Sequence, residues 1–194
     1  HMAEAMTRHM TEVDVYHLGP FAPLGSRHNV QHWGDSAKQL RIASVANVKT
    51  YLFLTADERT GDLMRAQVKA ANRLRQIVPG RKIGDHAPQQ NPEQHITVTF
   101  GTDWGAIAAA WLLEWERTGN TMMRDRLMLS MESIAAQPHG FFTGSGIMDL
   151  QNGLFKPDTT GRISVSHLSA AFGLPETCSE LIALLPSPSF KKAW

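Results

Sequence analysis

The densest group of chemically active side chains lies in residues 26–35, Ser-Arg-His-Asn-Val-Gln-His-Trp-Gly-Asp. Val30 is its only aliphatic side chain, so the segment is poorly suited to a buried core. A guanidinium can hold a carboxylate, an imidazole exchanges a proton near neutral pH, and an indole stacks on a sugar ring. The combination indicates a site for an anionic sugar. The residues that would form it are Arg27, His28, Gln31, His32 and Trp33.

Two other interpretations of this segment compete with the sugar site. His28 and His32 are four residues apart, so on a helix they would share a face and could bind a metal. A structural zinc site uses four ligands, however, and the one cysteine, Cys178, is far away in sequence. We therefore assign no metal and no other cofactor. The polar residues could also serve as an ordered loop, with Asp35 or Ser36 capping a helix that begins at Ala37.

Other candidates for chemistry lie further along the chain. Tyr16 could act as an acid or a base, although a packed tyrosine with a bonded hydroxyl is more common. The glycine-rich segment 137–146 presents His139, Phe141 and Phe142 outside any amphipathic stripe. Residues in loops are well placed to contact ligands.

Composition places limits on the function. The chain has 194 residues, 42% hydrophobic and 19% charged, with a formal net charge of +1. Its scattered, balanced charges argue against a nucleic-acid partner, and no apolar run is long enough to cross a membrane. His1-Met2 resembles a tag remnant, which leaves 3–194 as a single domain or a fragment of one.

Apolar periodicity predicts three antiparallel helical hairpins at 37–77, 104–136 and 164–185. The breaks within them are expected at Ala56-Asp57, at Gly119-Asn120 and at Gly173. Residues 190–194 read like the start of another helix. Repeated helix pairs of this kind are typical of an array or toroid in which each pair buries its apolar face against the next. The predicted fold is therefore all-α, with long connecting loops and one short β-hairpin.

Some features outside the hairpins are also predicted. Residues 13–16 suggest a short extended piece, 95–100 a short strand, and Asn152-Gly153 the turn of a hairpin. Asp103 is expected to cap a helix. Core packing is expected for Trp104, Trp111 and Trp115, and packing on a helix for Met122, Met123, Met128 and Met131.

Several blocks, taken in order, resemble the C-terminal α/α-toroid of rhamnogalacturonan exolyase-like proteins. The resemblance covers nearly all of the chain from about Val13 onward. The blocks are Arg-His-Asn-Val-Gln-His-Trp-Gly-Asp at 27–35, Tyr-Leu-Phe-Leu-Thr-Ala-Asp-Glu-Arg at 51–59, Thr-Asp-Trp-Gly at 102–105, Pro-His-Gly-Phe-Phe-Thr-Gly at 138–144, and Ser-His-Leu at 166–168 with Phe-Gly at 172–173.

The resemblance implies a partial α/α-toroid from a polysaccharide lyase that acts on uronate-containing polysaccharide by β-elimination. Such a reaction needs a cation to neutralise the carboxylate, a general base and a general acid. Arg27 or Arg41 could neutralise, His28 or His32 could act as base, and Tyr16 or His139 could act as acid. Sugar contacts are expected from Gln31, Trp33, Arg41, Phe141 and Phe142.

Two alternatives to a lyase remain open. A glycoside hydrolase would need two facing carboxylates, for which Asp35 and Asp103 are the candidates. A non-catalytic carbohydrate-binding or assembly module would need no acid or base. In all three cases the expected partner is an acidic polysaccharide or oligosaccharide, with no nucleic acid and no membrane. Unpaired helix faces in a partial toroid predict self-association as a homo-oligomer, and the resemblance implies a secreted or periplasmic protein.

Overall fold

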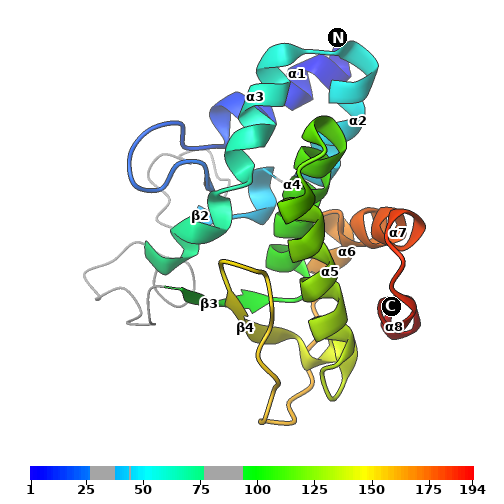
Figure 1. Ribbon diagram of the computed structural model, residues 1–194. Helices are drawn as coiled ribbons and strands as arrows, with labels where there is room; N and C mark the ends of the chain where they lie inside the picture. The colour runs from blue at the N-terminus through cyan, green and yellow to red at the C-terminus, as the bar shows by residue number, and fades with distance from the viewer. Residues whose placement is uncertain (27–37, 44, 77–93) are drawn as a thin grey trace.

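The computed structural model describes residues 1–26, 38–43, 45–76 and 94–194. Helices dominate this part of the chain, and the hairpin of α4 (Thr102–Thr118) and α5 (Thr121–Ala135) stands at its centre, as Figure 1 shows. Every residue of α4 from Thr102 to Leu113 is buried. A helix that is apolar on all sides is expected in a core, and α4 packs against helices and a strand from both ends of the chain.

The turn between α4 and α5 lies where the sequence predicts it. Gly119 adopts a left-handed conformation with φ of 70°, and its N–H donates to the Trp115 carbonyl at 2.7 Å. Asn120 then caps α5, because its side chain accepts from the Met122 N–H at 3.1 Å. A left-handed glycine followed by a polar cap ends one helix and starts the next.

The first predicted hairpin is also present, but it begins later than expected. It consists of α2 (Val45–Thr55), α3 (Glu58–Gln67), which Asp57 caps, and the 3-10 helix η4 (Ala70–Gln76). The predicted start at Ala37 is wrong, because β2 (Lys38–Gln39) and the 3-10 helix η3 (Arg41–Ala43) precede α2. Leu40 and Ile42 are buried there without being part of a long helix, and Ile42 packs against Gly25.

The third hairpin is shorter in its first half than predicted. α6 spans only Leu168–Ala171, and α7 spans Leu174–Leu184. Gly173 separates them with φ of 82°, as the sequence indicated. The helix expected at the end of the chain is α8 (Pro188–Ala193), which Ser187 caps, because its hydroxyl accepts from the Phe190 N–H at 3.4 Å.

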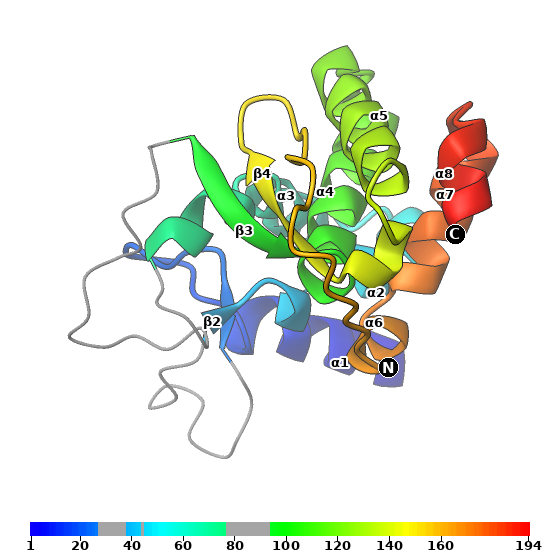
Figure 2. The same ribbon diagram turned by 90° about the horizontal axis from the view of Figure 1, so that it is seen from below.

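The first helices were not predicted from sequence. α1 (Met2–Arg8) continues into the π-helix η1 (His9–Val13) without an interruption of the backbone. The expected extended piece is limited to Val15, which forms a bridge with Gly25. α1 lies at the upper end of the molecule in Figure 1 and along the lower edge of the view in Figure 2.

Two small antiparallel sheets complete the described fold. β1 (Gly25–Ser26) pairs with β2, and β3 (His95–Thr99) pairs with β4 (Ser145–Asp149) so that His95 opposes Asp149 and Thr99 opposes Ser145. β3 confirms the predicted strand, whereas its partner β4 was not predicted. The turn at Asn152-Gly153 is confirmed, since the Gly153 N–H donates to the Asp149 carbonyl at 2.8 Å.

The predicted core residues mostly hold. Trp104, Trp111, Met123 and Met131 are buried in one cluster. Trp115 and Met128 are half-buried and pack against it. Met122 contradicts its prediction, because it follows the helix cap and is 52% exposed.

Among the described residues, no helix combines the length and the apolar character needed to cross a bilayer.

Candidate functional site

A pocket of 460 Å³ lies where the start of α4, the end of α8, α6 and the 3-10 helix η5 (Gly140–Thr143) meet. Gly101 allows α6 to come close, because a Cβ at this position would lie 2.0 Å from the Ser169 Oγ. The side chains that give the pocket its chemistry are Arg41, Phe141, Phe142, His167 and Trp194.

The aromatic wall of the pocket has a supporting part and an exposed part. Phe141 is half-buried and packs edge-on against Trp104, at a centroid distance of 5.7 Å, and against Trp194 at 5.1 Å. Phe142 and Trp194, in contrast, are 57% and 45% exposed. Phe141 therefore fixes the wall, and the other two rings keep surface available for a ligand.

Arg41 supplies the positive charge of the pocket. It belongs to η3, and its guanidinium carbon lies 5.1 Å from the centroid of the Phe172 ring. A guanidinium over an aromatic face is held by the negative potential of the ring. Arg41 is half-buried, so the cation is positioned and still reaches the pocket.

His167 supplies an imidazole directly before α6, where it is exposed. The neighbouring Ser166 Oγ accepts from the Leu168 N–H at 3.3 Å and so supports the start of that helix. Neither His167 nor Trp194 was a candidate on sequence grounds. The signal for His167 was the Ser-His-Leu block at 166–168, which contributed to the family resemblance but received no role.

Asp103 lies between β3 and α4, and the prediction that it caps α4 is wrong. Its carboxylate is 1% exposed and accepts from the Thr99 hydroxyl at 2.9 Å and from the Thr99 N–H at 3.4 Å. The Asp103 N–H donates back to the Thr99 Oγ1 at 3.2 Å, while Gly101 is the N-cap. This exchange ties the end of β3 to the first turn of α4, where Thr99 and Thr102 line the pocket.

The segment that the sequence analysis placed first lies outside the described residues. This applies to Arg27, His28, Gln31, His32 and Trp33, and also to the expected caps Asp35 and Ser36. Their predicted grouping with the loop 139–142 therefore stays a prediction. The residues that flank this segment, Ser26 and Lys38, are register partners in β1 and β2.

The structure does not bring the other predicted residues into one place. Arg41, Phe141 and Phe142 share the 460 Å³ pocket. Tyr16 lines a different cleft, of 720 Å³, which runs along α3 and includes Arg65 and Glu114. His139 is exposed before η5 and lines neither cavity; its N–H donates to the Thr143 Oγ1 at 3.3 Å.

The charge of the pocket favours anions. Among the described residues that line it, Arg41 and His167 are the ionisable side chains, and none is an Asp or a Glu.

Burial raises the pKa of the Cys178 thiol, which stays protonated in the core and has no nucleophilic role there. No group of three or more potential metal ligands occurs within the described ranges.

Helical hairpins packed around a central buried helix, with a pocket at a loop-rich end, define an α/α-toroid domain. Residues 1–194 match the PcRGLX-like protein C-terminal alpha/alpha toroid domain, and the chain belongs to this rhamnogalacturonan lyase-like family. The chain is also similar to "Uncharacterized protein YetA" of Bacillus subtilis (strain 168), with 37% identity over 185 residues. The match covers 95% of this chain but 21% of that relative. The family resemblance and the all-α toroid prediction are thereby confirmed.

Proposed function

We propose that this chain forms the acidic-sugar-binding part of a polysaccharide lyase that cleaves uronate-containing chains by β-elimination. The observation that carries the proposal is the 460 Å³ pocket, in which a guanidinium and an imidazole face the same space as two exposed aromatic rings. Aromatic surface with a few convergent polar groups is the usual composition of a ligand site. Membership of the toroid family supports the same substrate class.

The pocket side chains match steps of the elimination. Arg41 would bind the uronate carboxylate and so make the proton on the adjacent carbon more acidic. A base then removes that proton, the bond from the next carbon to the glycosidic oxygen breaks, and an acid protonates the leaving oxygen. His167 is the imidazole in the pocket that could carry either proton transfer.

The roles predicted from sequence remain proposals in addition to those of the pocket residues. Arg27 is the alternative cation, His28 or His32 the alternative base, and Tyr16 or His139 the alternative acid. Gln31 and Trp33 are proposed sugar contacts. Phe142 and Trp194 are the proposed stacking rings among the described residues, because both expose part of their surface.

A non-catalytic binding module is the second candidate. The pocket binds an anion equally well in that case, and the chain covers 21% of its relative, so further groups for catalysis would come from elsewhere. The hydrolase alternative is less favoured. Asp103, one of its two carboxylates, is buried and bonded to Thr99.

Self-association stays part of the proposal. Large apolar side chains are exposed on several elements, among them Phe53 and Leu54 on α2 and Val165 beside the pocket. Sedimentation at increasing protein concentration tests this expectation, and a monomer at every concentration would contradict it.

Ultraviolet absorbance on incubation with oligogalacturonates tests the lyase. Elimination leaves an unsaturated, absorbing product, whereas hydrolysis and binding do not. We expect Arg41→Gln to abolish product formation, and Arg124→Gln, an exposed arginine on α5, to leave it unchanged. Binding without absorbance would support the binding module, and neither binding nor absorbance would refute both proposals.

A further inference from the structure

A second hollow, of 630 Å³, lies beside the pocket and differs from it in character. Its lining is about equally polar and apolar, and so more polar than that of the pocket, and it includes hydroxyls from β3, from β4 and from the segment 156–164. The side chains that matter most for binding are Thr97, Ser145, Lys156, Thr160, Arg162 and Ser164. Hydroxyls and cations on an open surface suit a hydrated, charged ligand such as an acidic sugar.

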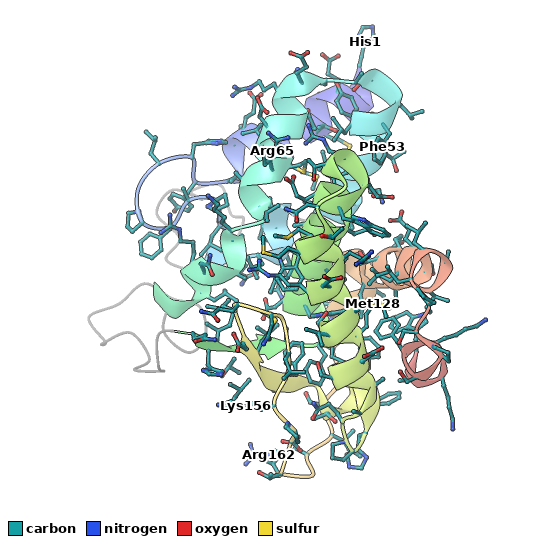
Figure 3. All side chains as sticks on the ribbon, in the orientation of Figure 1. His1, Phe53, Arg65, Met128, Lys156 and Arg162 are labelled. Atoms are coloured by element: carbon teal, nitrogen blue, oxygen red, sulfur yellow. The ribbon has the colours of Figure 1, made fainter. Side chains whose placement is uncertain are left out.

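The cations of this hollow have no anionic partner within the described ranges. Lys156 and Arg162 are both exposed, and neither forms an ion pair there. Figure 3 labels both side chains on the segment that connects β4 to α6. Lys49, in contrast, is bound by two carboxylates, Glu116 at 2.6 Å and Glu180 at 2.5 Å. Two cations without ion-pair partners line this hollow together with one carboxylate, that of Asp158, so the lining carries one net positive charge.

Asp158 also lines the hollow, and its carboxylate accepts hydrogen bonds from the backbone and side chain of the same turn. It accepts from the Thr160 hydroxyl at 2.9 Å, from the Thr160 N–H at 3.2 Å and from the Gly161 N–H at 2.9 Å. The hydrogen bond from the Thr160 side chain is the main reason that the pKa of Asp158 lies below its ordinary value. Asp158 therefore shapes the turn and leaves the two cations available to a ligand.

Two short stretches of chain, residues 142–145 and Ser164, separate the hollow from the pocket. Ser164 lines both cavities, and its N–H donates to the Phe142 carbonyl at 2.8 Å. Gly144, with φ of 83°, permits this contact, because a Cβ there would lie 2.6 Å from the Ser164 Cβ. Thr143 and Ser145 face the hollow, and Phe142 and Gly144 face the pocket. The two sites are therefore adjacent.

We infer that the 630 Å³ hollow is a second subsite, which binds the carboxylate of a further uronate of the same oligosaccharide through Lys156 and Arg162. The inference rests on the proposed function, because the pocket is taken as the first subsite. Two subsites on one ligand strengthen binding, since the second contact forms within the complex. The hollow would thus select acidic chains over single sugars.

Calorimetric titration with an oligogalacturonate several residues long tests the subsite. We expect Lys156→Gln and Arg162→Gln each to weaken binding about threefold, and the double variant about tenfold, as for exposed charge pairs. Arg41→Gln should weaken binding independently, and Arg124→Gln, on α5, should have no effect. The same oligosaccharide with its carboxylates reduced to alcohols should bind the wild-type chain and the double variant equally. Circular dichroism confirms that each variant is folded.

The outcomes separate this inference from the proposed function. If Arg41→Gln weakens binding and the double variant does not, the subsite is refuted and the pocket stands. If the double variant weakens binding and Arg41→Gln does not, the subsite stands and the pocket assignment fails. If the wild-type chain does not bind the oligosaccharide at all, both fail.

Discussion

The α4–α5 hairpin and the segment 138–166 contact each other, yet their side chains are used in opposite ways. In the hairpin, Trp104 and Leu127 are completely buried, and polar groups such as Ser133 are bonded inside the protein. In the segment, Phe142, Ile163 and Val165 are exposed, and two cations have no ion-pair partner within the described ranges. Figure 1 shows the segment leaving α5, passing through β4 and returning to the helices at α6.

The difference shows which chemistry belongs to stability and which to binding. Aromatic and charged residues occur in both regions, so residue type alone does not separate them. The two regions differ in whether the side chain is already buried, hydrogen-bonded or ion-paired within the protein. The hairpin therefore acts as the scaffold, and the segment presents groups that a ligand can satisfy.

Trp104→Ala gives the largest expected effect. Its indole is completely buried and packs against Phe141 and Phe190, so truncation leaves a cavity and should cost about 3–5 kcal/mol of unfolding free energy. Phe142→Ala is the matched change in the segment and should cost less than about 1 kcal/mol, since the ring is 57% exposed. Urea denaturation measures both, and equal losses would remove the contrast between scaffold and binding surface.

Lys49→Gln should have the next largest effect on stability. The ammonium is 11% exposed and joins α2 to Glu116 on α4 and Glu180 on α7. Its removal leaves two carboxylates close together, at a cost of about 1–2 kcal/mol after allowance for their partial exposure. Lys156→Gln, a cation without such partners, is the control and should unfold at the same urea concentration as wild type. A Lys49→Gln variant as stable as wild type would show that these two ion pairs do not stabilise the scaffold.

Gly144→Ala should affect the wall between the two cavities. An alanine here would have to adopt φ of 83°, and its methyl group would collide with Ser164. We therefore expect a loss of about 1–2 kcal/mol in the free energy of unfolding. Because Ser164 lines both cavities, oligogalacturonate binding should weaken as well. Gly161→Ala is the control, since it has a similar positive φ of 65° but open space around it. If both variants bind the ligand equally, the contact with Ser164 does not shape the sites.

Arg59→Gln should give the smallest effect, and one that depends on pH. The hydrogen bond from Arg59, at 2.6 Å, is the main reason that the pKa of Glu12 lies below its ordinary value of 4.5. A lowered folded-state pKa stabilises the protein above the unfolded-state pKa, and this contribution is lost as pH falls through the folded-state pKa. Arg59→Gln should therefore lower the free energy of unfolding slightly near neutral pH and leave it unchanged once Glu12 is protonated. Urea denaturation of wild type and variant, at neutral pH and at a pH that protonates Glu12, measures the difference in stability. A difference that persists at the acidic pH would contradict the prediction.

Local patterns were sufficient to predict the hairpins. The stripe from Trp104 to Trp115 and the polar break at Gly119-Asn120 carry their information within a few residues. α1 and η1 were missed because they carry few large apolar residues, of which Met2 and Met6 are exposed, and η1 is held partly by side chains such as Thr11, whose hydroxyl donates to the Thr7 carbonyl. β4 was missed because its partner β3 is distant in sequence.

The pocket was harder to predict than the fold. Arg41, Phe141 and Phe142 were candidates because of their types and neighbours, and the structure places all three in one cavity. His167 and Trp194 reach the same cavity only through the packing of α6 and α8, which no local spacing reveals. The Arg-His motif at 27–35 lies outside the described residues, so the sequence remains its only support.

The pairing of Thr99 with Ser145 sets an order on the folding of this chain. Residues 100–144 lie between these register partners, and closing a loop of that length costs chain entropy unless it is already folded. The antiparallel path of α4 and α5 returns the chain to its starting point, so the folded hairpin removes most of that cost. Helices with local contacts form quickly, and distant strand pairs form later. Both cavities include residues of β3 or of the chain beside β4, so we expect the binding surface to be assembled last and to open first in hydrogen exchange.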